Sequence, residues 1–410
     1  MGNRVDKYKP LVLLGVFAVV SELGYAVVNI SAMPMFVEFE LGMGHLLGVV
    51  FLAYLLAEAL FRAPLGVLSD RWGRKPFLVG APIVSIFTAL ATVRVNHILP
   101  LFGLRILDGA AAAAIWTTAY AAMGDATSEK RRATAMSVIN VSYMSGLALG
   151  PLAGGIVDDL SNGRMRPFAA SFYLAASLFF IAAAFAYFLY PKSDPAPRII
   201  ESRRSDKRRF DAFLYTARLM PEMLMIVVAT FLAIGFLVPI AKLFAVQELH
   251  MTETRFGGLL APGAAILGLL AVPLGHLADR WGRTRSVGLG LGIAACAMWL
   301  LARETNLFAV GAEVAALGVG FALGMPAWLA IVSERGEESR RGEVIGTAGM
   351  LQSMATVVGV IVGNHLYHSR RWQVGAVALS AHRLPFAGSA ILLTISLALC
   401  IAFVRDRRKE

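Results

Sequence analysis

Charged residues and cysteines are scarce in this chain of 410 residues. Only 16% of the residues are charged, whereas 57% are hydrophobic. A soluble protein of this length needs far more polar surface to face water. The two cysteines, Cys296 and Cys400, lie inside apolar runs, so neither indicates a disulfide or a metal site.

Sequence signals of nucleotide binding and of catalysis are also missing. The chain has no Gly-x-x-x-x-Gly-Lys-Ser/Thr loop, which argues against an ATP-driven activity. No pairing of a nucleophile with a base stands out, so we do not expect an enzyme. Several histidines near predicted outer loops lack metal-ligand spacing, and we expect no metal and no cofactor. These are His97, His250, His365, His368 and His382.

Long hydrophobic runs take the place of those signals. The mean hydropathy is +0.66, and stretches long enough to cross a bilayer as helices recur from end to end. The weak alternation typical of a membrane β-barrel is absent. We therefore predict an all-α membrane protein of about twelve transmembrane helices, the first retained rather than cleaved. They are expected at 10–36, 43–68, 76–97, 99–123, 133–157, 167–190, 222–247, 254–277, 285–302, 306–332, 343–367 and 384–404.

The net charge of +11 fits the same interpretation. Its basic residues cluster in alternate predicted loops, which is how membrane proteins mark their cytoplasmic side, so we expect no nucleic-acid partner. Arg370, Arg371 and Arg383 are exceptions on the outer side. The pattern predicts a multi-pass protein of the plasma or inner membrane with both termini in the cytoplasm.

An internal repeat gives the domain organisation. Residues 64–74 reappear as 273–283 with nine of the eleven positions identical, an offset of 209 residues from Gly66 to Gly275. Downstream glycines keep this register, so we predict two pseudo-symmetric six-helix bundles in parallel orientation. Their expected bounds are 1–190 and 222–410, joined by a cytoplasmic linker at 191–221. The last part of this linker, 210–220, is either a short interfacial helix or a solvated segment.

The repeated loop resembles the signature loop of the major facilitator superfamily. Residues 66–76 read GVLSDRWGRKP, and the helix count, the linker and the duplication agree with that family. The resemblance implies that Asp70 and its arginines clamp one half against the other in the outward-open state. Simple anchoring by positive charge is the alternative. The predicted switch residues are Gly66, Asp70, Arg71, Gly73, Arg74, Gly275, Asp279, Arg280, Gly282 and Arg283.

Two further motifs resemble those of the family's proton-coupled exporters. Arg105 lies in the span 99–123, with Asp108 where a glutamine or similar polar residue is usual, and the resemblance implies a role in proton transfer. Mutual neutralisation is the alternative, since the two are three residues apart. The span 133–157 resembles the antiporter motif, although close helix packing alone would also use its glycines. That motif comprises Gly146, Gly150, Pro151, Gly154 and Gly155.

Unpaired carboxyl groups in apolar spans are candidates for proton binding. Glu22 and Glu313 have no basic residue within one helical turn, and burial favours the protonated form of a carboxyl group. Glu58 and Arg62 are four residues apart and are expected to pair with each other. The predicted proton-coupling residues are Glu22, Arg105, Asp108 and Glu313. The predicted substrate cavity comprises Tyr25, Asn29, Glu58, Arg62, Trp116, Tyr143 and Trp328, although helix packing alone explains each aromatic residue.

These features predict a secondary active transporter that works by alternating access. The resemblance favours an antiporter for multidrug efflux, which exports a small amphipathic molecule or drug as protons enter. A proton symporter or facilitator for an organic anion or sugar is the alternative, with Arg62 and Arg105 contacting the anion. A membrane sensor is disfavoured because no soluble domain fits in the chain. We expect a monomer in the lipid bilayer, with a small molecule and protons as its partners.

Overall fold

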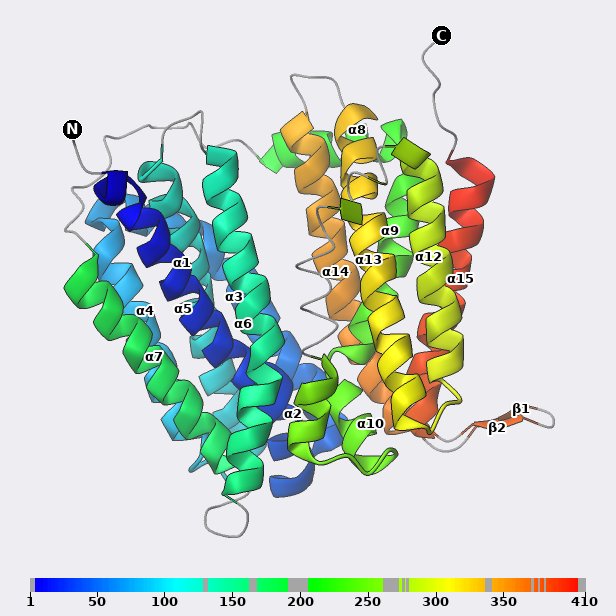
Figure 1. Cartoon of the computed structure of the whole chain (residues 1–410), viewed down its shortest axis with the longest axis horizontal. Helices are drawn as coiled ribbons and strands as arrows, with labels where there is room; N and C mark the ends of the chain where they lie inside the picture. The colour runs from blue at the N-terminus through cyan, green and yellow to red at the C-terminus, as the bar shows by residue number, and fades with distance from the viewer. Residues whose placement is uncertain are drawn as a thin grey trace. The chain divides into compact units, whose positions relative to one another are not determined.

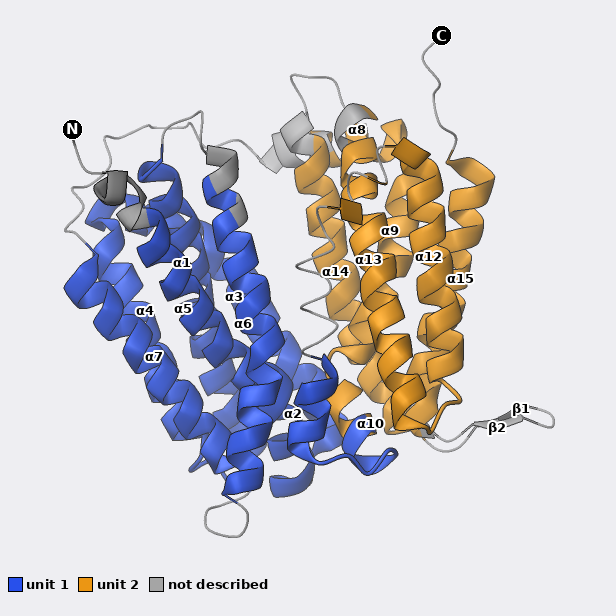
Figure 2. Ribbon diagram, in the orientation of Figure 1, with its two compact units in different colours: residues 1–198, 245–264 blue, residues 199–244, 265–410 orange. Residues whose placement is uncertain are grey.

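A computed structural model of the chain supplies the structure. It describes residues 4–127, 132–161, 168–190, 206–260, 273–274, 277, 280–335, 341–369, 372–374, 377–379 and 381–404. The chain forms two compact units, which Figure 2 shows in different colours. Unit 1 comprises residues 1–198 and 245–264, and unit 2 comprises residues 199–244 and 265–410.

Unit 1 is a bundle of long helices (Figure 1). Its first helix changes from α-helical to π-helical geometry just before Pro34 and ends at Glu40, later than predicted. Proline has no backbone N–H and so breaks the regular hydrogen-bond ladder. The elements are α1 Arg4–Ala26, η1 Val27–Ala32, α2 Met33–Met35, η2 Phe36–Glu40, η3 Gly44–Leu46, α3 Leu47–Trp72, α4 Arg74–Thr92, α5 Ile98–Asp125, α6 Arg132–Leu160 and α7 Ala169–Leu189.

Unit 2 is also helical, apart from one short hairpin. The predicted helix at 222–247 is interrupted between α9 and α10, where Pro239 cannot donate the hydrogen bond that a continuous helix needs. The helices are α8 Asp206–Leu219, α9 Pro221–Leu237, α10 Ala241–Gln247, α12 Arg283–Leu301, α13 Leu307–Arg335, α14 Arg341–Tyr367 and α15 Leu384–Phe403. The strands β1 Trp372–Val374 and β2 Val377–Leu379 pair antiparallel.

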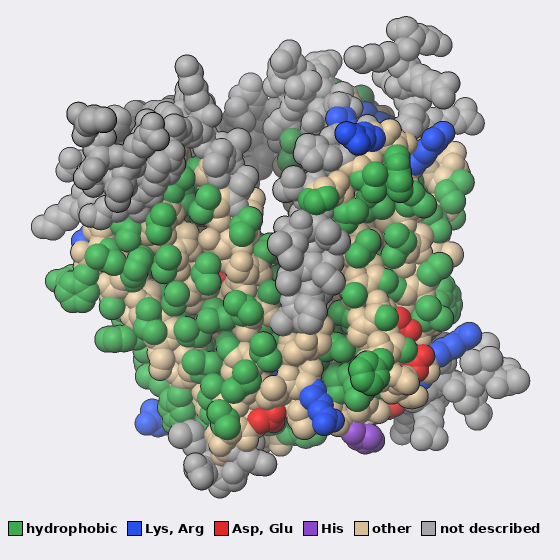
Figure 3. All heavy atoms as spheres, in the orientation of Figure 1, with side chains coloured by type: hydrophobic (Ala, Val, Ile, Leu, Met, Phe, Trp, Pro, Cys, Tyr) green, Lys and Arg blue, Asp and Glu red, His purple; other side chains and the backbone are tan. Residues whose placement is uncertain are grey.

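The all-α membrane class predicted from the sequence is confirmed. Among the described residues, nine helices are long and apolar enough to cross a membrane, or ten if the bent pair α8 and α9 counts as one span. The predicted helix at 254–277 lies mostly outside the described residues. Figure 3 shows hydrophobic side chains over the flanks of the helices. Phe180 and Phe188 of α7 are 64% and 77% exposed. Such a surface suits lipid rather than water.

The predicted linker contains a helix that turns sharply into the bundle. Residues 213–219 of α8 meet α9 at 103°, with the break at Met220 and Pro221. A helix that lies along the membrane surface is nearly perpendicular to a spanning helix. This geometry agrees with the interfacial helix that the sequence offered as one of two interpretations of 210–220.

Part of the second repeat packs within unit 1. The backbones of α6 and of the segment 245–264 approach so closely that a Cβ on Gly155 would lie 2.3 Å from the carbonyl oxygen of Glu253. A Cβ on Gly257 would lie 2.3 Å from Cα of Leu152. The segment is also held by a hydrogen bond of 3.0 Å from the backbone N–H of Thr254 to Asp159. Contacts therefore assign 245–264 to unit 1, and the bundle bounds taken from the repeat stay a prediction.

Each unit contains a close crossing of two helices, and the two crossings occur at positions related by the repeat. In unit 1, a Cβ on Gly150 of α6 would lie 2.3 Å from Cβ of Ala26 on α1. In unit 2, a Cβ on Gly359 of α14 would lie 2.8 Å from Cα of Gly235 on α9. Gly359 follows Gly150, and Gly235 follows Ala26, by the same 209 residues that separate the repeated loops. The internal duplication therefore extends from sequence to helix packing.

Candidate functional site

Arg105 on α5 is the centre of a buried polar network in unit 1. Its side chain is among the least exposed of the large ones, and its residue is 1% exposed. Nη1 donates to Asp108 Oδ2 at 2.8 Å, and Nη2 donates to Asn29 Oδ1 in the π-helical stretch η1. The guanidinium carbon lies 4.3 Å from the ring centroid of Tyr54 on α3, which is a cation–π contact. Arg105 on α5 therefore contacts both Asn29 of η1 and Tyr54 of α3.

Asp108 accepts hydrogen bonds from three side chains. Besides Arg105, it accepts a hydrogen bond at Oδ1 from Ser85 Oγ at 3.0 Å and one from Thr88 Oγ1 at 3.1 Å, both on α4. Tyr25 on α1 extends the chain, since its hydroxyl lies 2.8 Å from Ser85 Oγ. Every partner can donate to the carboxylate, and Arg105 carries a positive charge that offsets the negative charge of Asp108.

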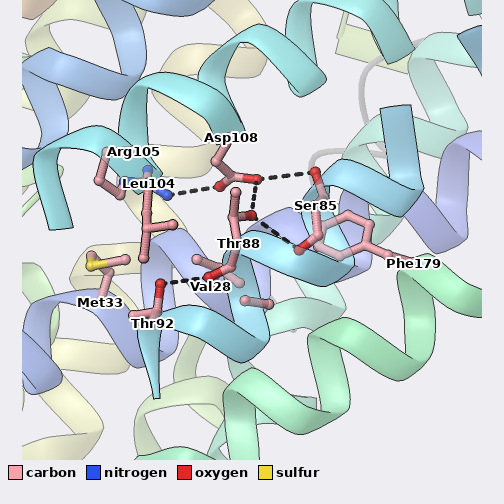
Figure 4. A pocket seen from close by; sticks show the side chains of 10 residues that line it. Val28, Met33, Ser85, Thr88, Thr92, Leu104, Arg105, Asp108 and Phe179 are labelled. Carbon is pink, nitrogen blue, oxygen red and sulfur yellow. Dashed lines mark hydrogen bonds and ion pairs between the residues drawn. The ribbon is translucent and has the colours of Figure 1, made fainter. Parts of the chain in front are cut away.

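A small cavity adjoins this network, as Figure 4 shows. Ser85, Thr88 and Thr92 of α4 line one side, and Arg105 and Asp108 of α5 line another. Apolar side chains complete the wall, and the space accommodates about one water molecule. The apolar residues around it are Val28, Met33, Ala89, Leu104 and Phe179.

Glu22 lies one turn before Tyr25 on α1 and is 4% exposed. The glycine stripe of α6 packs against this part of α1, and a Cβ on Gly146 would lie 2.7 Å from Cβ of Glu22. Tyr143, also on α6, acts electrostatically on the Glu22 carboxyl group, and Glu58 adds a like charge nearby. In the described part of the chain, no basic side chain forms an ion pair with Glu22.

The predicted pair on α3 forms, and two of the predicted aromatic residues contact each other. Arg62 Nη2 bonds to Glu58 Oε1, and the Arg62 side chain is 57% exposed whereas that of Glu58 is 13% exposed. The Trp116 and Tyr143 rings meet edge to face with centroids 5.0 Å apart. All the predicted cavity residues except Trp328 belong to unit 1.

The antiporter-like motif on α6 lies along the same helix pair. After Gly146 and Gly150, a Cβ on Gly154 would lie 2.7 Å from Ser31 Oγ. Pro151 lies inside α6 and faces the segment 245–264, since its carbonyl carbon would be 2.6 Å from a Cβ on Gly257. The glycine stripe therefore lets α6 pack closely against the helix that carries Glu22. This close packing was predicted from the spacing of the glycines.

The predicted residues of unit 2 are isolated by comparison. Glu313 on α13 is 7% exposed, and Oε2 has no hydrogen-bond partner among the described residues. Glu304 adds a like charge that acts on Glu313. The pKa of Glu304 is lowered because the backbone N–H groups of Asn306 and Thr305 donate to its carboxylate. Trp328 is 3% exposed, and its Nε1 likewise has no partner in the described part of the chain.

The first switch loop forms an ion network inside unit 1. Gly73 has φ 88°, and the repeat residue Gly282 has φ 98°, so both copies turn through a conformation that favours glycine. Arg74 pairs with Asp70, donates to Ser69 Oγ at 2.8 Å and donates to Asp125 Oδ2 on α5 at 3.0 Å. Arg71 and Arg280 are exposed, and Gly66 has room for a side chain. Gly275 and Asp279 lie outside the described residues.

Sequence analysis missed several members of the buried network. Ser85, Thr88 and Tyr54 carry neither charge nor motif, and aromatic and hydroxyl side chains are common in membrane helices. The spacing of Ser85, Thr88 and Thr92 places them on one face of a helix, which was the only signal available. Their importance depends on the approach of α4 to Asp108.

The chain belongs to the Major Facilitator Superfamily. The sequence profile of that family matches residues 14–266 and 223–410, which together span nearly the whole chain. The protein is therefore a multi-span membrane transporter of small molecules rather than an enzyme.

Characterised relatives and a solved structure agree with this assignment. The tetracycline resistance protein of class H from Pasteurella multocida is 25% identical, over 78% of this chain and 79% of its own. The multi-drug resistance efflux pump PmrA from Streptococcus pneumoniae is 25% identical, over 81% of this chain and 83% of its own. The fold matches a bacterial homologue of the human lysosomal transporter Spinster, inward-facing and unoccupied, with a TM-score of 0.74 and 15% identity over 97% of each chain.

Proposed function

We propose that this transporter exports a small amphipathic molecule or drug in exchange for protons. Alternating access moves the substrate outward as protons move inward. Relatives named as tetracycline-resistance and multi-drug efflux proteins support export. The antiporter-like glycine stripe on α6 supports exchange rather than symport.

The observation that carries the proposal is the setting of Glu22. Its carboxyl group is buried, has no ion-pair partner among the described residues and lies beside a tyrosine hydroxyl and a second carboxylate. A carboxyl group in such surroundings binds a proton more readily than one in water. Glu22 is therefore the proposed proton carrier, with Glu313 as a further candidate in unit 2.

Arg105 and Asp108 have a different proposed role. Asp108 is neutralised by Arg105 and by two hydroxyl donors, so it is a poorer carrier than Glu22 in this conformation. The same network reaches α1 through Asn29 and Tyr25, the helix on which Glu22 lies. A change of charge at Glu22 would thus be felt by Arg105, which couples protonation to the arrangement of α1, α4 and α5.

The switch loops have a proposed conformational role as well. The ion network around Arg74 links the ends of α3, α4 and α5. We propose that Asp70 and Arg71, which are exposed, engage the other half of the protein in the outward-open state.

The alternative function is proton symport or facilitated movement of an organic anion or sugar. It rests on Arg62, whose guanidinium group is more than half exposed although it pairs with Glu58. An anionic substrate would be expected to bind this group directly.

The test is transport by purified protein in liposomes with an imposed pH gradient. We would measure uptake of a fluorescent lipophilic cation, a neutral antibiotic and an organic anion under inside-acid, inside-alkaline and equal pH. Antiport predicts accumulation of the cation or the neutral compound only when the inside is acid. Accumulation only when the inside is alkaline would establish symport instead, and indifference to the gradient would overturn proton coupling.

A further inference from the structure

The cavity beside α4 holds a polar group that the described network leaves unpaired. Arg105 Nε is buried and has no hydrogen-bond partner among the described residues, although Nη1 and Nη2 are both bonded. Leaving a buried N–H of a cation without an acceptor costs roughly 1–3 kcal/mol. Arg105 lines the cavity of Figure 4, so an acceptor placed there can reach it.

A single water molecule fits both the size and the chemistry of this cavity. The space accommodates about one water, and a buried water typically makes two to four hydrogen bonds. Arg105 Nε offers a donor, Asp108 offers carboxylate oxygens, and the hydroxyl oxygens of Thr88 and Thr92, whose hydrogens are already donated, offer acceptors. An apolar molecule would leave Arg105 Nε unsatisfied.

The hydroxyl groups of α4 continue from this cavity along the helix. Thr88 Oγ1 is within 3.1 Å of both Asp108 Oδ1 and the carbonyl oxygen of Ser85. Thr92 Oγ1 donates to the carbonyl oxygen of Thr88 at 2.7 Å, one turn closer to the end of α4. Thr92 is the last residue of the helix, so the row runs from Asp108 to the loop that follows α4.

We infer that this cavity binds one water molecule and that, with Thr88 and Thr92, it forms a proton path from the end of α4 to Asp108. The inference rests on the proposed proton coupling. A proton arriving on the water passes to Asp108, which becomes a neutral acid, and the water returns to its neutral state. Arg105 then loses its counter-ion and keeps its bond to Asn29 on η1. The reverse transfer restores the ion pair.

Other ionisable groups around Asp108 set the conditions for this transfer. Arg105 on the same helix favours the ionised carboxylate, whereas α4 and α7 contribute only neutral side chains to the cavity. Tyr25 on α1 and Tyr54 on α3 lie within electrostatic reach of Asp108. Glu58 acts on both tyrosines, and Glu22 acts on Tyr25.

The test removes the water or the hydroxyl groups without adding charge. Ala89→Leu fills the cavity, and Thr92→Val removes the hydroxyl group at the end of the row while keeping the side-chain shape. Thr92→Ser retains the hydroxyl group and is the rescue variant. Thr356→Val on α14 is the control in unit 2, because its hydroxyl group also donates to a carbonyl one turn back, at 2.9 Å.

Two rates are measured for each variant in liposomes: substrate uptake driven by a pH gradient, and exchange of labelled for unlabelled substrate at equal pH. We expect Ala89→Leu and Thr92→Val to slow gradient-driven uptake by at least about tenfold while exchange changes little. Thr92→Ser and Thr356→Val should keep both rates near those of the unmodified protein. Equal slowing of both rates would identify a structural defect and overturn the inference.

A high-resolution map of the unmodified protein tests the water directly. Density within hydrogen-bonding distance of Arg105 Nε is expected, and an empty cavity would overturn the inference. The proposed function can fail separately, because transport by the unmodified protein that ignores the pH gradient would refute proton coupling and the path together. A gradient-dependent protein whose Ala89→Leu and Thr92→Val variants respond normally would refute the path alone.

Discussion

The two units have the same helix crossing but different chemistry. Gly150 meets Ala26 in unit 1, and Gly359 meets Gly235 in unit 2, at positions related by the 209-residue repeat. Gly73 and Gly282 make the same turn in the two copies of the signature loop. The ionisable residues do not follow the repeat, because the positions of Glu22, Arg105 and Asp108 are occupied in unit 2 by Phe231, Val314 and Leu317.

This difference separates what the fold requires from what the function requires. Close helix approach and a tight turn are needed in both halves, because each bundle must pack without lipid-exposed backbone. Buried charge is costly and is therefore kept only where it is used. Unit 1 holds the polar network, and the described part of unit 2 presents mainly apolar side chains at the related positions.

Removing Arg105 should have the largest effect. Arg105→Met leaves Asp108 buried without its cation, which typically destabilises a protein by about 3–5 kcal/mol, and transport should be lost. The double variant Arg105→Met with Asp108→Leu should recover much of the thermal stability but none of the transport. The related change in unit 2, Val314→Met, should alter both little. Thermal unfolding in detergent and liposome uptake measure the two effects, and equal sensitivity at Arg105 and Val314 would contradict the comparison.

Neutralising Glu22 should affect coupling more than stability. Glu22→Gln keeps the side-chain shape and removes the titratable group, so accumulation against a gradient should fail while substrate binding survives in part. Glu313→Gln is the matched change in unit 2, and we expect a smaller loss there because no coupled network surrounds it. Uptake under a pH gradient and thermal shift with substrate measure the two properties. Normal gradient-driven transport by Glu22→Gln would remove this residue from the mechanism.

Filling the shared helix crossing should destabilise both units alike. A Cβ on Gly150 would lie 2.3 Å from Cβ of Ala26, and one on Gly359 would lie 2.4 Å from the carbonyl oxygen of Leu232. Each Gly→Ala change should cost about 1–3 kcal/mol through overpacking. Gly346→Ala on α14 is the control, since no atom lies within 4 Å of its added Cβ and helix propensity favours alanine by about 1 kcal/mol. If the melting temperature falls for only one of the Gly150→Ala and Gly359→Ala variants, the two crossings are not equivalent.

The switch-loop ion pair should have the smallest effect on stability. Asp125 is more than half exposed where it meets Arg74, so Asp125→Asn should cost at most about 1 kcal/mol. The repeat places Glu334 at the position related to Asp125 and Arg283 at that of Arg74. If both loops act alike in switching, Glu334→Gln and Asp125→Asn should lower the transport rate to a similar extent. A defect confined to one of the two would show that the loops have different roles.

Much of this protein follows from its sequence because the relevant signals are local. The apolar runs predict the helices, since a span in lipid must bond its own backbone. The repeat predicts related halves, and the loop at 66–76 predicts the family that the profile match confirmed. The motif around Arg105 predicted a buried arginine with Asp108 as its partner, and both are found together. The roles assigned to these residues stay predictions.

Only the tertiary structure decided which side chains share one site. Arg105 meets Asn29 across 76 residues of chain, and Asp108 meets Ser85 across 23, and neither distance is a helical spacing. Hydroxyl and amide groups occur throughout membrane helices and gain importance only from what packing places beside them. The sequence alone determined that a few costly charges are buried in apolar helices, because hydropathy and charge are properties of single residues. Their partners, the cavity beside α4 and the unpaired Arg105 Nε depend on how separate helices meet, which no single stretch of sequence contains.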